Sequence, residues 1–193
     1  MKKLLFLPLM ALFGVAALTP VIYKVDPSSS VVVWKGYKVT GEHTGTVKLK
    51  NGELQFTDGK LTGGSFEVDM TTITCTDLEG ATAAKLVSHL KSDDFFGVQQ
   101  HPIARFVITK AFPVDTKGNY RIAGDLTIKG ITKEIKFNAA VSDSGNQVKA
   151  TGKITIDRTE FNVRYGSGSF FDNLGDKTIY DEFDLNVTVV AKK

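Results

Sequence analysis

The chain has 193 residues, of which 42% are hydrophobic and 23% charged, and its formal net charge is +3 at pH 7. This length favours one domain that can bury a substantial core. The small net charge argues against nucleic acid as a partner, and the single cysteine, Cys75, excludes an internal disulfide.

The first segment, residues 1–19, has the make-up of a secretory signal peptide. Lys2 and Lys3 form a positive start, and residues 4–18 form an apolar run broken only by one proline and one glycine. A run of about 15 residues is shorter than the roughly 20 that a membrane-spanning helix needs. We therefore expect a periplasmic or secreted protein, residues 20–193, with no stable membrane span once the signal is removed.

The rest of the chain alternates apolar and polar residues in short runs rich in valine, threonine and aromatic residues, which is typical of β-strands. Dipeptides such as Asn51-Gly52 and Asp58-Gly59 predict tight turns between them. The predicted strands are residues 31–40, 44–50, 61–70, 104–112, 119–129, 131–141, 147–157 and 182–191. Short connections favour antiparallel neighbours, and closure into a barrel would remove exposed sheet edges. The predicted fold is thus an all-β, eight-stranded antiparallel barrel.

One segment has helical rather than strand periodicity. Residues 81–91 place apolar side chains three and four positions apart, so we expect one α-helix there. Residues 92–94 then read as a turn, and Phe95 and Phe96 as a plug for one end of the barrel. The stretch resembles a lid more than a catalytic centre.

Four glycines fall in the inward register of predicted strands, among Trp34 and several phenylalanines. They are Gly36, Gly64, Gly124 and Gly152. Glycine inside a strand packs no side chain, so these positions would either leave an apolar cavity for a ligand or relieve strand coiling. Both interpretations stay open at this stage.

Catalytic motifs are absent from the sequence: there is no G-x-S-x-G, H-E-x-x-H, C-x-x-C or phosphate-binding lysine loop. His43, His89 and His101 could in principle serve a metal- or haem-dependent periplasmic enzyme, but the short spacings usual for metal ligands are missing. A filled barrel that acts only as a structural or interaction module is a further alternative. We expect a protein that is no enzyme and holds no metal or cofactor.

Six stretches resemble the YceI-like family. They are YKVDPSSSVVVW (23–34), HLKSDDFF (89–96), HPIARF (101–106), GDLTIKGITKEIKF (124–137), ITIDRTEF (154–161) and IYDEFDLNV (179–187). The resemblance implies a lipocalin-like barrel in an exported protein. It also implies that the barrel interior holds a long-chain isoprenoid or acyl lipid: a polyisoprenoid, an isoprenoid quinone, or a fatty amide or acid.

This resemblance suggests where such a ligand would lie. The expected wall of the apolar tunnel is formed by Trp34, Phe66, Phe106, Leu126, Phe137 and Phe183. Lys38, His43 and Arg158 are candidates for contacts with a polar head group. Residues 164–178, longer and more polar than is usual in the family, would form an elaborated barrel mouth or a homodimer contact.

Overall fold

The computed structural model describes residues 19–193, so the predicted signal peptide lies outside the described residues except for Thr19. The described strands are β1 Val21–Val25, β2 Val31–Lys38, β3 Gly41–Thr57, β4 Lys60–Asp69, β5 Ile103–Pro113, β6 Asn119–Ile128, β7 Ile131–Asp143, β8 Gln147–Asp157 and β9 Ile179–Lys192. The helices are α1 Gly80–Lys91 and the short 3-10 turns η1 Met70–Thr72, η2 Arg158–Phe161 and η3 Gly175–Lys177.

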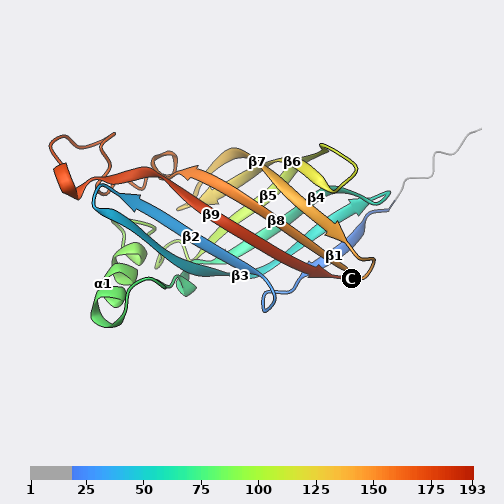
Figure 1. The fold of residues 1–193 in the computed structure, drawn as a ribbon, viewed down its shortest axis with the longest axis horizontal. Helices are drawn as coiled ribbons and strands as arrows, with labels where there is room; N and C mark the ends of the chain where they lie inside the picture. The colour runs from blue at the N-terminus through green and yellow to red at the C-terminus, as the bar shows by residue number, and fades with distance from the viewer. Residues whose placement is uncertain (1–18) are drawn as a thin grey trace, which may run out of the picture.

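The strands close into an antiparallel barrel (Figure 1). Eight of them form the ring in the order β3-β2-β9-β8-β7-β6-β5-β4, and β4 pairs back onto β3. The short strand β1 lies where β2 has not yet begun, and bridges β3 to β9 at that end. The predicted eight-stranded antiparallel barrel is confirmed, with β1 as an addition that the sequence pattern did not reveal.

One predicted turn is wrong. Asn51 and Gly52 lie inside β3, which is 17 residues long, because the strand passes this point with a shift of register against β4 instead of reversing. Gly52 is opposite Phe66, and a Cβ there would come within 2.9 Å of the Phe66 ring. The glycine therefore serves close packing, whereas the other predicted turn, Asp58-Gly59, does reverse the chain between β3 and β4.

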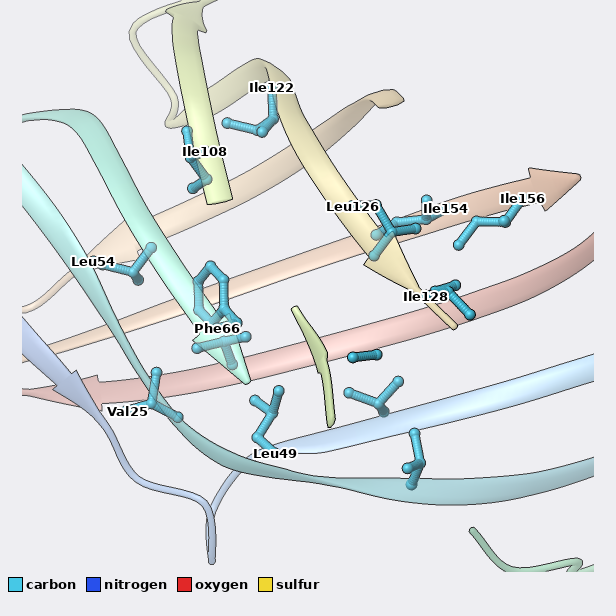
Figure 2. Packing of buried hydrophobic residues seen from close by; sticks show 14 of the residues in the cluster. Val25, Leu49, Leu54, Phe66, Ile108, Ile122, Leu126, Ile128, Ile154 and Ile156 are labelled. Carbon is cyan, nitrogen blue, oxygen red and sulfur yellow. The ribbon is translucent and has the colours of Figure 1, made fainter. Parts of the chain in front are cut away.

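The two ends of the barrel differ. At the end that holds the C-terminus, inward side chains fill the interior, and Leu54 and Ile122 are each only 1% exposed. Figure 2 shows part of this core, with Phe66 between Leu54 on one side and Leu126 on the other. Tyr23 and Phe56 pack edge to face in the same region, with 5.3 Å between their ring centroids.

The predicted helix is confirmed, and α1 lies at the opposite end (Figure 1). Its C-cap is Ser92, whose backbone N–H donates to the carbonyl of His89. Leu90 and the following Phe95 are buried, so this end is covered by an apolar layer from the helix and the turn after it. Within the described residues, no helix combines the length and apolar character needed to cross a bilayer.

Candidate functional site

A cavity of about 310 Å³ occupies the α1 end of the barrel interior. Its wall comes from the ends of β2, β3, β4, β5, β6 and β9 nearest to α1, from the helix itself, and from the chain around Arg158 and Tyr165. The side chains facing it are mostly aliphatic or aromatic. Tyr165 and Tyr180 border it and are about half exposed, so the cavity reaches solvent beside them.

Strand β2 shows how the sequence builds this wall. Val32, Trp34 and Gly36 border the cavity, as the two-residue period of a strand requires. The register against β9 shifts after Gly36, and both Tyr37 and Lys38 border the cavity there. The indole Nε1 of Trp34 donates to the carbonyl of Thr74, at 3.0 Å, so the polar edge of the ring is satisfied outside the cavity. Lys38, half-buried at the end of the strand, places an amine at the apolar cavity's edge.

The lid is aromatic on its inner side. Phe95 and Phe96 border the cavity and contact each other edge to face, with centroids 5.2 Å apart. Phe96 in turn meets Phe183 of β9 at 6.4 Å. The ring of His89, near the end of α1, packs against Tyr165 at 4.3 Å. These contacts join the helix to β9 and to the loop after η2, as the prediction of a Phe-Phe plug requires.

His43 borders the cavity at its polar edge, and a carboxylate fixes its orientation. Its Nδ1 lies 2.8 Å from Oδ2 of Asp77, and an ionised carboxylate can only accept, so this nitrogen carries the hydrogen. Burial alone would raise the pKa of Asp77. Hydrogen bonds from the Thr44 backbone, His43 and Cys75 outweigh it and lower that pKa to about 2. With the hydrogen on Nδ1, the other ring nitrogen, Nε2, has the lone pair of an acceptor.

Arg158 also borders the cavity, but its guanidinium is committed to the protein. It is 2% exposed and donates to four backbone carbonyls at 2.8–3.1 Å and to the carboxylate of Asp181 at 3.4 Å. The carbonyls belong to Val163, Tyr165, Ile179 and Tyr180. Burial lowers the pKa of Arg158. The arrangement ties η2, the following loop and the start of β9 together.

The predicted tunnel residues divide into two groups. Trp34, Leu126 and Phe183 border the cavity. Phe66, Phe106 and Phe137 do not; they contact one another at the inner end of the cavity, Phe66 to Phe106 at 6.4 Å and Phe106 to Phe137 at 5.6 Å. Sequence reasoning missed the residues of the lid and mouth that also border it, among them Leu86, Tyr165 and Tyr180. Leu86 lies in α1, whose period predicts an apolar face but not what that face covers. Tyr165 lies in a loop and Tyr180 at the start of β9, where alternation gives no signal.

The interpretation of inward glycines as ligand space holds at one of four positions. A Cβ on Gly36 would meet nothing within 4 Å. At Gly124 it would come within 2.5 Å of the Phe106 ring, and at Gly152 within 3.5 Å of the Phe137 ring. At Gly64 it would meet the Glu53 carbonyl at 2.7 Å. The last three are therefore covered by neighbouring atoms, because large side chains lie across them.

The three histidines do not converge. His43 and His89 border the cavity, but His101 lies beneath the turn at Gly130 instead. Over residues 19–193, no three His, Cys, Asp or Glu side chains come together as metal ligands would. Residues 164–178 form part of a second hollow of about 610 Å³, which has a mixed polar and apolar lining and shares Tyr165 with the cavity. Asp93, Asp94 and Lys129 also border it.

The sequence model of the YceI-like domain matches residues 23–191. A UPF0312 protein of Pseudomonas putida is 28% identical over 183 residues, which cover 89% of this chain and 87% of that protein. Another, from Shewanella denitrificans, is 33% identical over 97 residues, but the match spans only about half of each chain, 49% of this one and 47% of the other.

Solved structures share the fold. Burkholderia cenocepacia BcnA superposes with a TM-score of 0.71 at 23% identity, covering 87% of this chain and 99% of that one. A polyisoprenoid-binding domain from Saccharophagus degradans, implicated in plant cell wall breakdown, superposes with a TM-score of 0.63 at 11% identity, covering 91% and 99%. At these identities the likeness concerns the fold alone.

Proposed function

The chain belongs to the YceI-like domain family, and from this premise we propose that it is a binding protein for the hydrocarbon chain of an isoprenoid or acyl lipid. The observation that carries the proposal is the apolar cavity of about 310 Å³ inside the barrel. Ligand sites of this kind start at about 300 Å³ and are lined mainly by hydrophobic side chains. The polyisoprenoid-binding domain of Saccharophagus degradans, which shares the fold, supports the same class of ligand.

Burial of hydrocarbon supplies enough free energy without any covalent step. A cavity of about 150 Å³ can hold one benzene, so one of about 310 Å³ has room for roughly twelve carbon atoms. Each buried methylene contributes about 0.8 kcal/mol, giving about 10 kcal/mol before the costs of association are subtracted. We accordingly propose sequestration or transport of the lipid rather than catalysis.

The head group would lie at the polar edge, beside His43 and Lys38. Both border the cavity, and Asp77 holds the imidazole so that Nε2 is available. A carbonyl, hydroxyl or amide head group fits these two residues. Arg158 is a poor partner, because its N–H groups already have acceptors in the protein.

The place of action and the assembly state belong to the proposal as well. We propose that residues 1–19 direct export and that the protein works in the periplasm or outside the cell. The exposed aromatic side chains of residues 164–180, Tyr165, Phe170, Phe171 and Tyr180, are where a homodimer contact would form. Sedimentation of the unaltered protein and of Phe171→Ser at several concentrations measures whether a dimer forms through these side chains.

The proposal is tested by extracting purified protein with organic solvent and identifying released lipids by mass spectrometry. Binding is then measured with the extracted protein by the fluorescence of Trp34, the only tryptophan in the chain. Recovery of a prenyl or acyl species, and saturable quenching or enhancement by it, is expected. Absence of both would refute the proposal.

Gly36 offers a matched pair of variants. Gly36→Leu places a side chain in the cavity where a Cβ meets nothing within 4 Å, and should weaken binding tenfold or more by displacing about two methylenes of ligand. Lys35→Leu adds the same side chain at the neighbouring outward position and should leave affinity unchanged. Equal effects of the two substitutions would place the ligand outside the barrel.

A further inference from the structure

On three neighbouring strands, β4, β5 and β6, the cavity ends partway along the barrel interior. On neighbouring strands, the residue that borders the cavity is followed two positions deeper by an inward residue that does not. These pairs are Val68 and Phe66 on β4, Ala104 and Phe106 on β5, and Leu126 and Gly124 on β6. Phe66 and Phe106 are directly opposite each other across β4 and β5. Gly124 is opposite Ile108 rather than Phe106, so the boundary continues onto β6 through the Phe106 ring, which lies across Gly124.

Three phenylalanine rings form that boundary, which we call the aromatic floor: Phe66, Phe106 and Phe137. Phe66 and Phe106 stack nearly parallel, at 17° and 6.4 Å, and Phe106 meets Phe137 at 5.6 Å. The Phe106 ring lies across Gly124, so the space that this glycine leaves is taken. The same holds for Phe137 and Gly152, although less tightly.

Beyond the floor the interior is solid. Leu54, Ile122 and Val148 are at most 1% exposed there. In Figure 2, Phe66 separates Leu54 from Leu126, the residue that borders the cavity. A chain entering from the α1 end thus meets rings in contact with a packed core, and protein cores of this kind have few voids larger than a water molecule.

We infer that the aromatic floor sets an upper limit on the length of hydrocarbon that the barrel can bury, at about twelve carbons on the volume scale used above. The inference rests on the proposed function and specifies its ligand: a medium-length chain fits entirely, and a longer one must leave its remainder outside the barrel. Phe106 is the specificity-determining residue, since it alone contacts both other rings of the floor.

The test uses unbranched primary alcohols of 6 to 18 carbons as probes, with affinity measured by Trp34 fluorescence. For the unaltered protein, affinity should rise about fourfold with each carbon, as burial of a methylene predicts, and stop rising near twelve carbons. A rise that continues through 18 carbons would overturn the inference while leaving the proposed function intact. If no alcohol of any length binds, the proposed function itself fails.

Two substitutions should move the limit in opposite directions. Phe106→Ala removes the central ring of the floor and should shift the break by two or more carbons toward longer chains. Leu126→Phe adds a ring above the floor and should shift it toward shorter chains. A break that neither substitution moves would contradict the inference.

The matched control is Phe56→Ala. It removes a buried ring from the solid half of the core, where Phe56 packs on Tyr23, so it should weaken the fold without moving the break. Circular dichroism and thermal unfolding establish that each variant is folded before its affinities are compared. Leu126→Phe removes no side-chain atoms from the core and extends into the cavity, so the test stands even if Phe106→Ala does not fold.

Discussion

Arg158 has an acceptor for each of its five N–H groups. Nε meets one carbonyl, one terminal nitrogen meets two, and the other meets a carbonyl and the carboxylate of Asp181. Its guanidinium also lies 5.5 Å from the centre of the Phe95 ring. A planar group with donors on three nitrogens can hold carbonyls from separate segments at once, which a single ammonium cannot. Arg158 therefore fixes the loop that borders the cavity mouth.

We predict that Arg158→Lys lowers the free energy of unfolding by about 3 kcal/mol, because buried carbonyls lose charged donors and the remaining charge is poorly partnered. Urea titration followed by circular dichroism measures this. Arg164→Lys changes an exposed arginine six residues away and should have almost no effect. A loss of lipid affinity in Arg158→Lys with unchanged stability would instead indicate direct contact with the ligand.

The sequence predicted that Arg158 would be near the ligand, but not what it does there. Its acceptors are backbone carbonyls 5 to 22 residues away, two in the loop after η2 and two at the start of β9. Main-chain acceptors carry no residue-type signal, so a structural arginine and a ligand-binding one look alike in sequence. His43 was hard to interpret for a different reason: its partner is a side-chain carboxylate, but Asp77 lies 34 positions on, outside the strands, where spacing gives no signal.

At the scale of strands, Asp184 on the outer face of β9 joins three neighbours. Its carboxylate accepts hydrogen bonds from Tyr37 of β2 and Thr155 of β8, both at 2.7 Å, and pairs with Lys153 of β8 at 2.8 Å. These groups, Lys153 first among them, lower the pKa of Asp184 to about 2 from an ordinary 3.8. The Asp184 side chain is 10% exposed but that of Lys153 is 62% exposed, so solvent screens the ion pair more than the hydrogen bonds from Tyr37 and Thr155.

This pKa predicts a dependence of stability on pH. A carboxyl whose pKa is lower in the folded than in the unfolded state stabilises the fold above the unfolded value, and loses that contribution as pH falls through the folded value. Asp184 should contribute up to about 2 kcal/mol at pH 6, lost between about pH 4 and pH 2. The difference in unfolding free energy between the unaltered protein and Asp184→Asn should shrink over that range.

Asp58→Asn is the control for this measurement, since Asp58 is exposed in the turn before β4 and asparagine accepts its positive φ of 52°. Its difference from the unaltered protein should stay small at every pH. A difference for Asp184→Asn that stays constant from pH 6 to pH 2 would show that the carboxylate charge does not stabilise the strand pairing.

Alternation predicted eight strands because each has one face in the core and one in solvent, and α1 because its period differs. The length of each strand, and whether a turn interrupts it, were harder to predict. Asn51-Gly52 accepts a tight turn, yet in β3 the pairing with β4 continues past it and the glycine accommodates Phe66. Whether such a dipeptide reverses the chain depends on partners elsewhere in the sheet, and one strand's sequence does not contain them.

At the scale of the whole molecule, the barrel is solid at one end and hollow at the other, which the sequence left open. Inward glycines occur in both halves: Gly36 borders the cavity, whereas Gly124 lies under the Phe106 ring. Whether an inward glycine leaves open space depends on whether a ring from the neighbouring strand lies across it, as the Phe106 ring does at Gly124. Residue type alone is compatible with either outcome, because glycine next to phenylalanine can mean space or the means of filling it.

This division predicts that leucine-to-alanine substitutions lower the unfolding free energy by different amounts in the two halves of the barrel. Leu54→Ala removes side-chain atoms that are surrounded by protein and should lower the unfolding free energy by about 4 kcal/mol. Leu126→Ala should cost only about 2 kcal/mol, because the side of Leu126 that faces the cavity has no protein atoms to lose. Chemical denaturation of lipid-free protein measures both.

Enlarging the same two side chains should also have different effects on the unfolding free energy. Leu54→Phe forces a ring into a filled core and should cost about 1–3 kcal/mol, whereas Leu126→Phe extends into the cavity and should be neutral or stabilising. Bound lipid would supply the missing contacts at Leu126, so adding it should raise the cost of Leu126→Ala toward that of Leu54→Ala. Equal costs in lipid-free protein would mean that the α1 end collapses onto itself when empty, and a cavity that collapses could not hold a pre-formed place for a chain.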